Sequence, residues 1–243
     1  MTKKIIAKAN GSKKYQKNQV ILKEIQTTLG STILSAKDAV DAIYKFEQAS
    51  FKNGTTVEVH FNLQINTTKS DQLVRNSVVL PHGTGKEVKI VAFVNPENVA
   101  MASKLGCFKV GSDELIEEIK TSGKVDFDIA IAEPEMMKKL PAIARILGTA
   151  GVMPNPKTGT VGSDLKKMVE LIKAGKVDYK NDKAANIHFG IGKINKEFTP
   201  EKILANLEAA IDSVEKAKPE VLKKKFIKSI TISTTMSPSV KIR

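Results

Sequence analysis

Two segments rich in proline and glycine divide this chain and constrain how it can fold. The stretch LGTAGVMPNPKTGTVGSD, at 147–164, places four glycines and two prolines among large apolar side chains. Proline fixes φ and forces the preceding residue into extended backbone, so MPNPK is expected to be a stiff, extended piece between flexible glycines. A similar stretch, LPHGTGK, occupies 80–86. Two such crossings around one compact segment predict a domain inserted into another domain, with hinges near 80–86 and 148–162.

The segment between the crossings has the pattern of a parallel α/β domain. Strand-like runs VKIVAFV and DFDIAIA alternate with helix-like runs such as PENVAMASKLG, GSDELIEEIKTSG and PAIARILG. Strands that alternate with helices in this way form βα units, with helices covering a mostly parallel sheet. We therefore expect an inserted Rossmann-like three-layer α/β domain at 70–159.

The two outer parts of the chain have a mixed pattern. A capped helix is predicted from Ser35 to about Ala49, and TTVEVHFNLQIN, from Thr55, alternates as a half-buried strand does. Further elements follow the second crossing: a helix capped by Ser163, two short strands in KVDYKNDKAANIHFGIGK, a helix opening at Thr199, and a final strand in FIKSITISTTMSPSVKIR. This mixture predicts a discontinuous α+β domain, a split sandwich formed by 1–69 and 160–243.

The positive charge of the chain lies outside the segment between the crossings. The formal net charge is +13, but 88–147 holds eight basic and nine acidic residues, which leaves +14 for the rest. The first 23 residues contain seven lysines and no acid, which indicates a mobile basic arm that either follows phosphates or is disordered and idle. Such an excess is typical of nucleic-acid binding, and the alternative is a lysine-rich surface that maintains solubility.

Cysteine content and hydropathy exclude several classes of protein. Cys107 is the only cysteine, so a disulfide framework and a cysteine metal site are both excluded. The chain has no apolar run of membrane-spanning length, and its first residues lack the apolar core of a secretory signal. These features predict a soluble protein of the cytoplasm, with no membrane partner.

An enzyme that uses the Rossmann-like domain is the first rival hypothesis. GTGK at 83–86 resembles part of a phosphate loop, but Leu80 stands where that loop needs glycine, and Glu87 stands where it needs serine or threonine. The histidines His60, His82 and His188 are scattered in sequence without metal-ligand spacing. No catalytic signature is present. We therefore expect no enzymatic activity, no cofactor and no metal.

The aromatic content favours structured RNA over single strands. The chain has no tryptophan and no aromatic-rich segment on which splayed bases would stack. STTMSP near the C-terminus has hydroxyls suited to ribose oxygens and a thioether suited to an apolar sugar or base face. An ordinary strand ending in a turn is the simpler reading of that motif by itself.

Four blocks of sequence together resemble a known family. SDQLVRNSVVLPHGTGK, LGTAGVMPNPKTGTV, KNDKAANIH and TTMSPSVKI occur in the order and spacing of the bacterial-type large-subunit ribosomal protein L-one family, the side-stalk proteins. The resemblance spans roughly 36–243 and implies a discontinuous first domain with an inserted Rossmann-like second domain.

The resemblance also implies function and partners. Members grip a folded stem of large-subunit rRNA, and their mobile stalk assists release of deacylated tRNA from the exit site. Many also repress their own operon by binding the mRNA leader. The expected partners are therefore large-subunit rRNA, exit-site tRNA, the protein's own mRNA leader and other ribosomal components, with the free protein a monomer. A free regulator that acts on messenger leaders without residing in the ribosome is the third hypothesis.

Matching the family motifs position by position gives the candidate RNA-binding residues. They are Phe51, Lys52, Thr56, Glu58, Lys180, Asp182, Lys183, His188, Thr235, Met236 and Ser237. The two acids are expected to orient basic neighbours or to accept from ribose hydroxyls. Ser237 stands where the family generally has glycine, so Ser237→Gly is expected to bind RNA as well or better.

Overall fold

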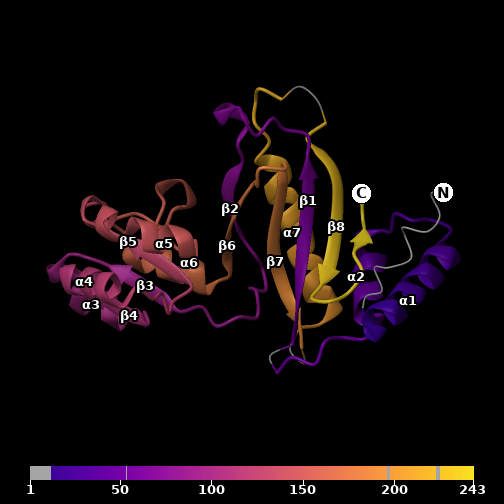
Figure 1. Cartoon of the computed structure of the whole chain (residues 1–243), viewed down its shortest axis with the longest axis horizontal. Helices are drawn as coiled ribbons and strands as arrows, with labels where there is room; N and C mark the ends of the chain where they lie inside the picture. Colours follow the sequence, from indigo (N-terminus) through magenta and orange to yellow (C-terminus); the bar gives the residue numbers. More distant parts are fainter. Residues whose placement is uncertain (1–11, 53, 196–197, 223–224) are drawn as a thin grey trace, which may run out of the picture. The chain divides into compact units, whose positions relative to one another are not determined.

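The computed structural model describes residues 12–52, 54–195, 198–222 and 225–243. The chain divides into two compact units (Figure 1). Unit 1 is formed by Met1–Gly85 and Tyr179–Arg243, and unit 2 by Lys86–Asp178. Unit 1 holds 25 lysines and arginines against 13 acids, a net charge of +12, whereas unit 2 holds 14 against 13. The charge asymmetry seen in the sequence therefore follows the structural division.

The first boundary lies later in the chain than the expected position at 69/70. Residues 70–85 belong to unit 1, where they form η2 (Ser70–Gln72) and β2 (Arg75–Val79). The backbone N–H of Asn181 donates to Val74 O (3.0 Å), and the Asn181 side-chain oxygen accepts from Val74 N (2.8 Å). Leu80 is fully buried. These long-range contacts, which leave no local signal in the sequence, fasten the segment to unit 1.

The second boundary was also expected too early, at 159/160. It lies at 178/179, inside β6 (Lys176–Lys180), which pairs with β2. Val161 forms a parallel bridge with Ala132, and α6 (Leu165–Lys173) buries its apolar stripe within unit 2. The stretch 148–162, expected to be the second hinge, therefore lies inside unit 2.

The sheet of unit 1 is built around its first strand. β1 (Thr55–Leu63) lies between β7 (Asn186–Ile194) and β8 (Ile227–Thr234), antiparallel to both, and β9 (Val240–Lys241) extends the sheet beyond β8. The three long strands alternate between buried and more exposed side chains. This alternation, predicted for β1 from its sequence, gives the sheet one apolar and one polar face.

Two amphipathic helices bury the apolar face of this sheet. α2 (Ala36–Lys45) begins after Ser35, whose side chain accepts from Asp38 N, and ends about four residues before the predicted end. α7 (Pro200–Lys216) begins after Thr199, with proline in its first turn as predicted. The buried stripe of α7 is Ile203, Leu207, Ala210 and Val214.

Another helix replaces part of the expected N-terminal arm. α1 (Lys13–Leu29) is capped by Ser12 and ends at Gly30 in the left-handed conformation. The expectation of a mobile arm is therefore wrong for residues 13–23, while residues 1–11 lie outside the described part of the chain. Three residues of α1 contact the segment after α2: Lys14 donates to Gln48 O, Lys17 pairs with Glu47, and the Asn18 amide bonds the Glu47 backbone.

Unit 2 is a three-layer α/β fold. Its parallel sheet has the order β4 (Lys109–Gly111), β3 (Ile90–Phe93), β5 (Ile129–Ala132). One face packs against α4 (Asp113–Ser122), η4 (Met136–Lys138), η5 (Leu140–Ile143) and α5 (Ala144–Ala150). The other packs against α3 (Val99–Lys104), which follows η3 (Pro96–Asn98), and α6. The predicted mixture of α/β and α+β architecture is confirmed.

Local capping and turn chemistry differ in detail from the prediction. The side chain that caps α6 is Asp164, which accepts from Lys167 N at 3.1 Å, and not Ser163. The proline-rich stretch closes on itself around η6 (Pro156–Thr158), where Thr160 donates its backbone N–H and its hydroxyl to Asn155 O. None of the described helices is long and apolar enough to cross a membrane.

Candidate nucleic-acid interface

The polar face of the unit 1 sheet presents side chains that form hydrogen bonds. We call this the open face. The strand registers place its residues in rows, with His188, His60 and Thr231 in one row and Asn186, Asn62 and Ser229 in the next. All of these side chains are half-buried or exposed, whereas the alternating positions are buried. The open face consists of Thr56, Glu58, His60, Asn62, Asn186, His188, Ser229, Thr231 and Ser233.

Seven of the predicted site residues lie at one end of the open face, where β1 begins and β8 ends. The backbone N–H of Thr235 donates to Thr56 O at 3.3 Å. Glu58 lies opposite Ser233, one residue before Thr234. Phe51 and Lys52 belong to the loop that leads into β1, and both are exposed. The apolar ring of Phe51 is 53% exposed, which is unusual for so large a side chain.

The turn after β8 is held by a side chain and carries backbone strain. Ser237 Oγ accepts from the Thr234 backbone N–H (3.0 Å) and hydroxyl (2.7 Å), and lies 3.1 Å from Thr234 O. Met236 has φ of 69°, in the left-handed region, and its side chain is 66% exposed. The residue with positive φ is therefore Met236, and not the serine that replaces the family glycine.

Lys180, Asp182 and Lys183 lie at the opposite end of the sheet. Asp182 accepts from the backbone N–H groups of Asn186 (2.7 Å) and Ala184 (2.9 Å), which lowers the pKa of its carboxyl group. Thr67 donates its hydroxyl to Lys183 O at 3.0 Å. Asp182 thus shapes the turn before β7, which presents Lys180 and Lys183 to solvent.

Two histidines join the ends across the middle of the open face. Nδ1 of His60 lies 2.9 Å from Nδ1 of His188, and Nε2 of His60 lies 2.9 Å from Ser233 Oγ. Nε2 of His188 lies 3.7 Å from Asp182 Oδ2. Burial lowers the pKa of His60, the neighbouring His188 lowers it further, and Glu58 opposes both effects. Strand pairing thus brings together two histidines that lie 128 positions apart in the sequence.

Apart from His188, which lies between them, the predicted residues therefore form two groups near the two ends of the open face. The groups are about 20 Å apart along β1 if each residue rises about 3.3 Å. Sequence reasoning missed the side chains between them: His60, Asn62, Asn186 and Ser233. The signal that could have found them is the two-residue period of β1, which puts Thr56, Glu58, His60 and Asn62 on one face.

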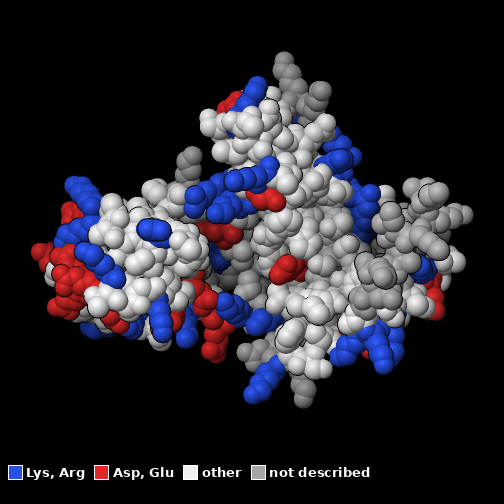
Figure 2. All heavy atoms as spheres, in the orientation of Figure 1, with Lys and Arg blue, Asp and Glu red and all other residues white. Residues whose placement is uncertain are grey.

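Charge on the surface follows the two units. Figure 2 shows acidic and basic side chains intermixed on unit 2, whereas the visible part of unit 1 has several clusters of lysine and arginine and fewer acids. The net charge of +12 on unit 1 favours a polyanion. In the part of the chain with described coordinates, no three His, Cys, Asp or Glu side chains gather closely enough to hold a metal ion.

Comparison with known proteins agrees with this picture. The model of the ribosomal protein L1p/L10e family matches residues 10–238. The chain belongs to this family. It is similar to the large ribosomal subunit protein uL1 of Mycoplasma capricolum, with 48% identity over 196 residues that cover 81% of this chain and 85% of the relative. The resemblance inferred from the four sequence blocks is confirmed.

Two further relatives extend the match. The large ribosomal subunit protein uL1 of Kosmotoga olearia is 43% identical over 205 residues, which cover 84% of this chain and 87% of the relative. That of Persephonella marina is 41% identical over 222 residues, or 91% of each chain. Membership of a ribosomal protein family also confirms the expectation that this chain is not an enzyme.

Proposed function

We propose that this protein is a structural component of the large ribosomal subunit and that it binds a folded stem of large-subunit rRNA on the open face of unit 1. The observation that carries the proposal is the combination of a +12 unit with an uncovered polar sheet face. The family membership supports the ribosomal setting.

The side chains of the open face suit a folded RNA. Hydroxyl, amide and imidazole groups can both donate to and accept from ribose 2′-hydroxyls, which distinguish RNA from DNA. Lysines at the sheet ends, including Lys52, Lys180 and Lys183, supply the charge that neutralises phosphates. The exposed side chains of Phe51 and Met236 add apolar contact with sugars or base faces.

The two acids near this surface have different roles. Oδ1 of Asp182 accepts from two backbone N–H groups of its own turn, so this residue positions Lys183 by holding the turn. Glu58 is exposed and lies directly opposite Ser233 on the open face. A carboxylate there accepts from a ribose hydroxyl and repels a phosphate, which selects how a stem lies on the sheet.

The stalk and regulatory activities are finer parts of the proposal. A unit that holds rRNA while the other unit remains free fits a mobile stalk that assists release of deacylated tRNA. A leader with the same folded shape as the rRNA site would occupy the same face, and the protein would then repress its own operon. Both activities rest on the family resemblance together with the two-unit division.

The main test measures affinity for RNA by filter binding against salt. We expect tight binding to one folded rRNA fragment and a steep fall of log K against log salt. Lys183→Ala should reduce the slope by about 1, the effect of one lost phosphate contact. The matched control is Lys104→Ala, which removes an exposed lysine of unit 2. Equal affinity for random duplex RNA at moderate salt would reject the proposal.

A second measurement separates a ribosomal component from a free regulator. A ribosomal component sediments with large subunits after a high-salt wash, because its site lies within the particle. A free regulator remains in the supernatant while it still binds a messenger leader.

A further inference from the structure

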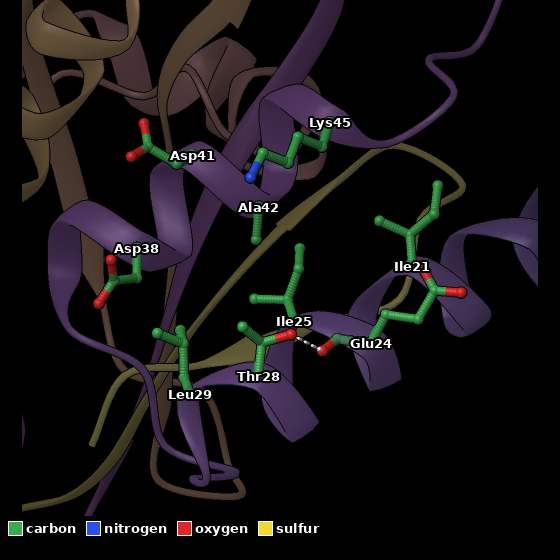
Figure 3. A pocket seen from close by; sticks show the side chains of 9 residues that line it. All are labelled: Ile21, Glu24, Ile25, Thr28, Leu29, Asp38, Asp41, Ala42 and Lys45. Carbon is green, nitrogen blue, oxygen red and sulfur yellow. Dashed lines mark hydrogen bonds between the residues drawn. The ribbon is translucent and has the colours of Figure 1, made fainter.

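A groove separates the two N-terminal helices of unit 1. It encloses about 410 Å³ between α1 and α2, and Figure 3 shows side chains from both helices turned toward it. Its apolar lining consists of Ile21, Ile25, Leu29 and Ala42. We call it the α1–α2 groove. Since α2 contacts α7, β8 and β9, the groove belongs to the helical layer of unit 1 and not to the open face.

α1 buries little of its apolar surface. Of its 17 residues, only Asn18 is buried. Ile21, Ile25 and Leu29 recur every four residues, the spacing of an apolar stripe that a helix normally packs against a core. Leu29 is nevertheless 48% exposed, and Ile33, just beyond the helix, is 46% exposed. A stripe left in solvent this way marks a surface that another element covers.

The charges around the groove are opposite to those of the unit. Glu24, Asp38 and Asp41 line it, with Lys45 as the single cation. Asp38 accepts from the Ser35 hydroxyl at 2.6 Å. Among the described residues, the carboxylates of Glu24 and Asp41 have no hydrogen-bond or ion-pair partner. This local negative charge repels phosphate and attracts a cation, so RNA is a poor occupant.

We propose that the α1–α2 groove docks an amphipathic helix of a partner protein, with apolar anchors on one face and lysine or arginine beside them. The apolar stripe runs from Ile21 to Leu29, about 12 Å along α1 at 1.5 Å per residue. Anchors at positions i, i+3 or i+4, and i+7 of a partner helix span a similar length. The partner's cations then face the unpaired carboxylates.

A second copy of the chain is a weaker occupant. Two copies of unit 1, each with a net charge of +12, repel each other. The groove of a second copy is also lined mainly by carboxylates, so it does not supply the cations that the first groove attracts. The docking site is also separate from the open face, so a partner helix and rRNA can bind the same molecule together. The docking proposal does not depend on the RNA-binding proposal.

The test uses the full chain and two labelled peptides in fluorescence anisotropy. The probe is a 14-residue helix-forming peptide composed only of leucine and lysine, and its counterpart has glutamate in place of lysine. We expect the lysine peptide to bind at least about ten-fold more tightly than the glutamate peptide. Glu24→Lys and Asp41→Lys should each weaken it about five-fold or more. The control Asp71→Lys, the same charge change in η2 outside the groove, should have less than about a two-fold effect.

Apolar docking is tested separately from charge. Leu29→Asn removes an exposed anchor, so it should weaken the lysine peptide, while far-ultraviolet circular dichroism shows whether the fold is kept. Equal affinity for the two peptides, or equal effects of Asp41→Lys and Asp71→Lys, overturns the proposal.

Other occupants of the groove give different results. If sedimentation velocity shows a dimer that Glu24→Lys dissociates, a second copy fills the groove and the proposal is wrong. If removal of residues 1–11, which contain three lysines and two isoleucines, raises peptide affinity about ten-fold, the chain's own N-terminal segment is the occupant. Competition between the rRNA fragment and the lysine peptide would also overturn the docking proposal, because the α1–α2 groove and the RNA site would then overlap.

Discussion

His60 and His188 face each other across the register of β1 and β7, with their Nδ1 atoms 2.9 Å apart. One ring must accept and the other donate, so the contact is lost when both are protonated. Burial of His60, its largest perturbation, and the neighbouring His188 both favour the neutral ring and lower the pKa of His60 below its ordinary value of 6.5. Proton uptake by His60 is therefore disfavoured while its ring is packed on the open face.

The lowered pKa of His60 predicts the direction of a pH effect on stability. A group with a depressed folded-state pKa binds fewer protons in the folded than in the unfolded chain, so stability falls as pH drops below about 6.5. Denaturant unfolding between pH 5 and 8 should show this loss, and His60→Gln should reduce it. His82→Gln, a histidine outside the pair, is the control. An unchanged pH profile in His60→Gln would show that the pair makes no such contribution.

Met236→Ala should weaken binding of the rRNA fragment by about 1 to 3 kcal/mol, the cost of one specific contact. The melting temperature should hardly change, because the side chain is 66% exposed and alanine has the same unfavourable positive φ. Met236→Gly removes the left-handed strain but adds flexibility, so its free energy of unfolding should stay within about 1 kcal/mol. Val221→Ala, which truncates another exposed apolar residue, should leave affinity unaltered.

Ser237→Gly should destabilise the protein and not improve RNA binding, contrary to the expectation from the sequence. The serine hydroxyl accepts from two groups of Thr234, a residue only 4% exposed. Leaving buried donors unpaired costs about 1 to 3 kcal/mol of unfolding free energy. Equilibrium denaturation checks this, with the exposed Ser239→Ala as control. A Ser237→Gly variant as stable as the parent would mean that water replaces the hydroxyl.

Asn206→Leu should be strongly destabilising. The amide is fully buried in α7, donates to Gly83 O (2.8 Å) and Ile191 O (2.7 Å), and accepts from His82 N (3.0 Å). Leucine has similar volume but leaves three backbone groups without partners, at a cost of about 3 kcal/mol or more. Glu208→Leu, on the exposed side of α7, should change stability by less than about 0.5 kcal/mol. Chemical denaturation of both variants gives the comparison.

Local patterns were sufficient for much of the fold. The alternation in β1, the apolar stripe of α6 and the proline after Thr199 each act within a few residues, and each predicted its element correctly. The unit boundaries depend instead on pairings between distant segments, such as Ala132 with Val161, which leave no local trace. A high density of proline and glycine therefore did not distinguish turns inside unit 2 from a crossing between the units.

The same distinction applies to the candidate site. Family motifs indicated the residues at both sheet ends, where turns carry distinctive sequences. They also indicated His188, but the placement of His60 and Thr231 beside it follows only from the strand registers. The role of Ser237 also needed the structure. Its hydroxyl reaches Thr234 because of the shape of the turn, which the sequence alone does not show.

The strand order of unit 1 also determines when the open face can form during synthesis. β1 emerges early, but both of its neighbours, β7 and β8, lie more than 120 residues further along the chain. Unit 2 is complete at Asp178, before either neighbour has been made. The nascent chain therefore carries a β-strand with two unpaired edges until β7 is made, and with one unpaired edge until β8 follows. Unpaired strand edges expose the chain to aggregation during this period.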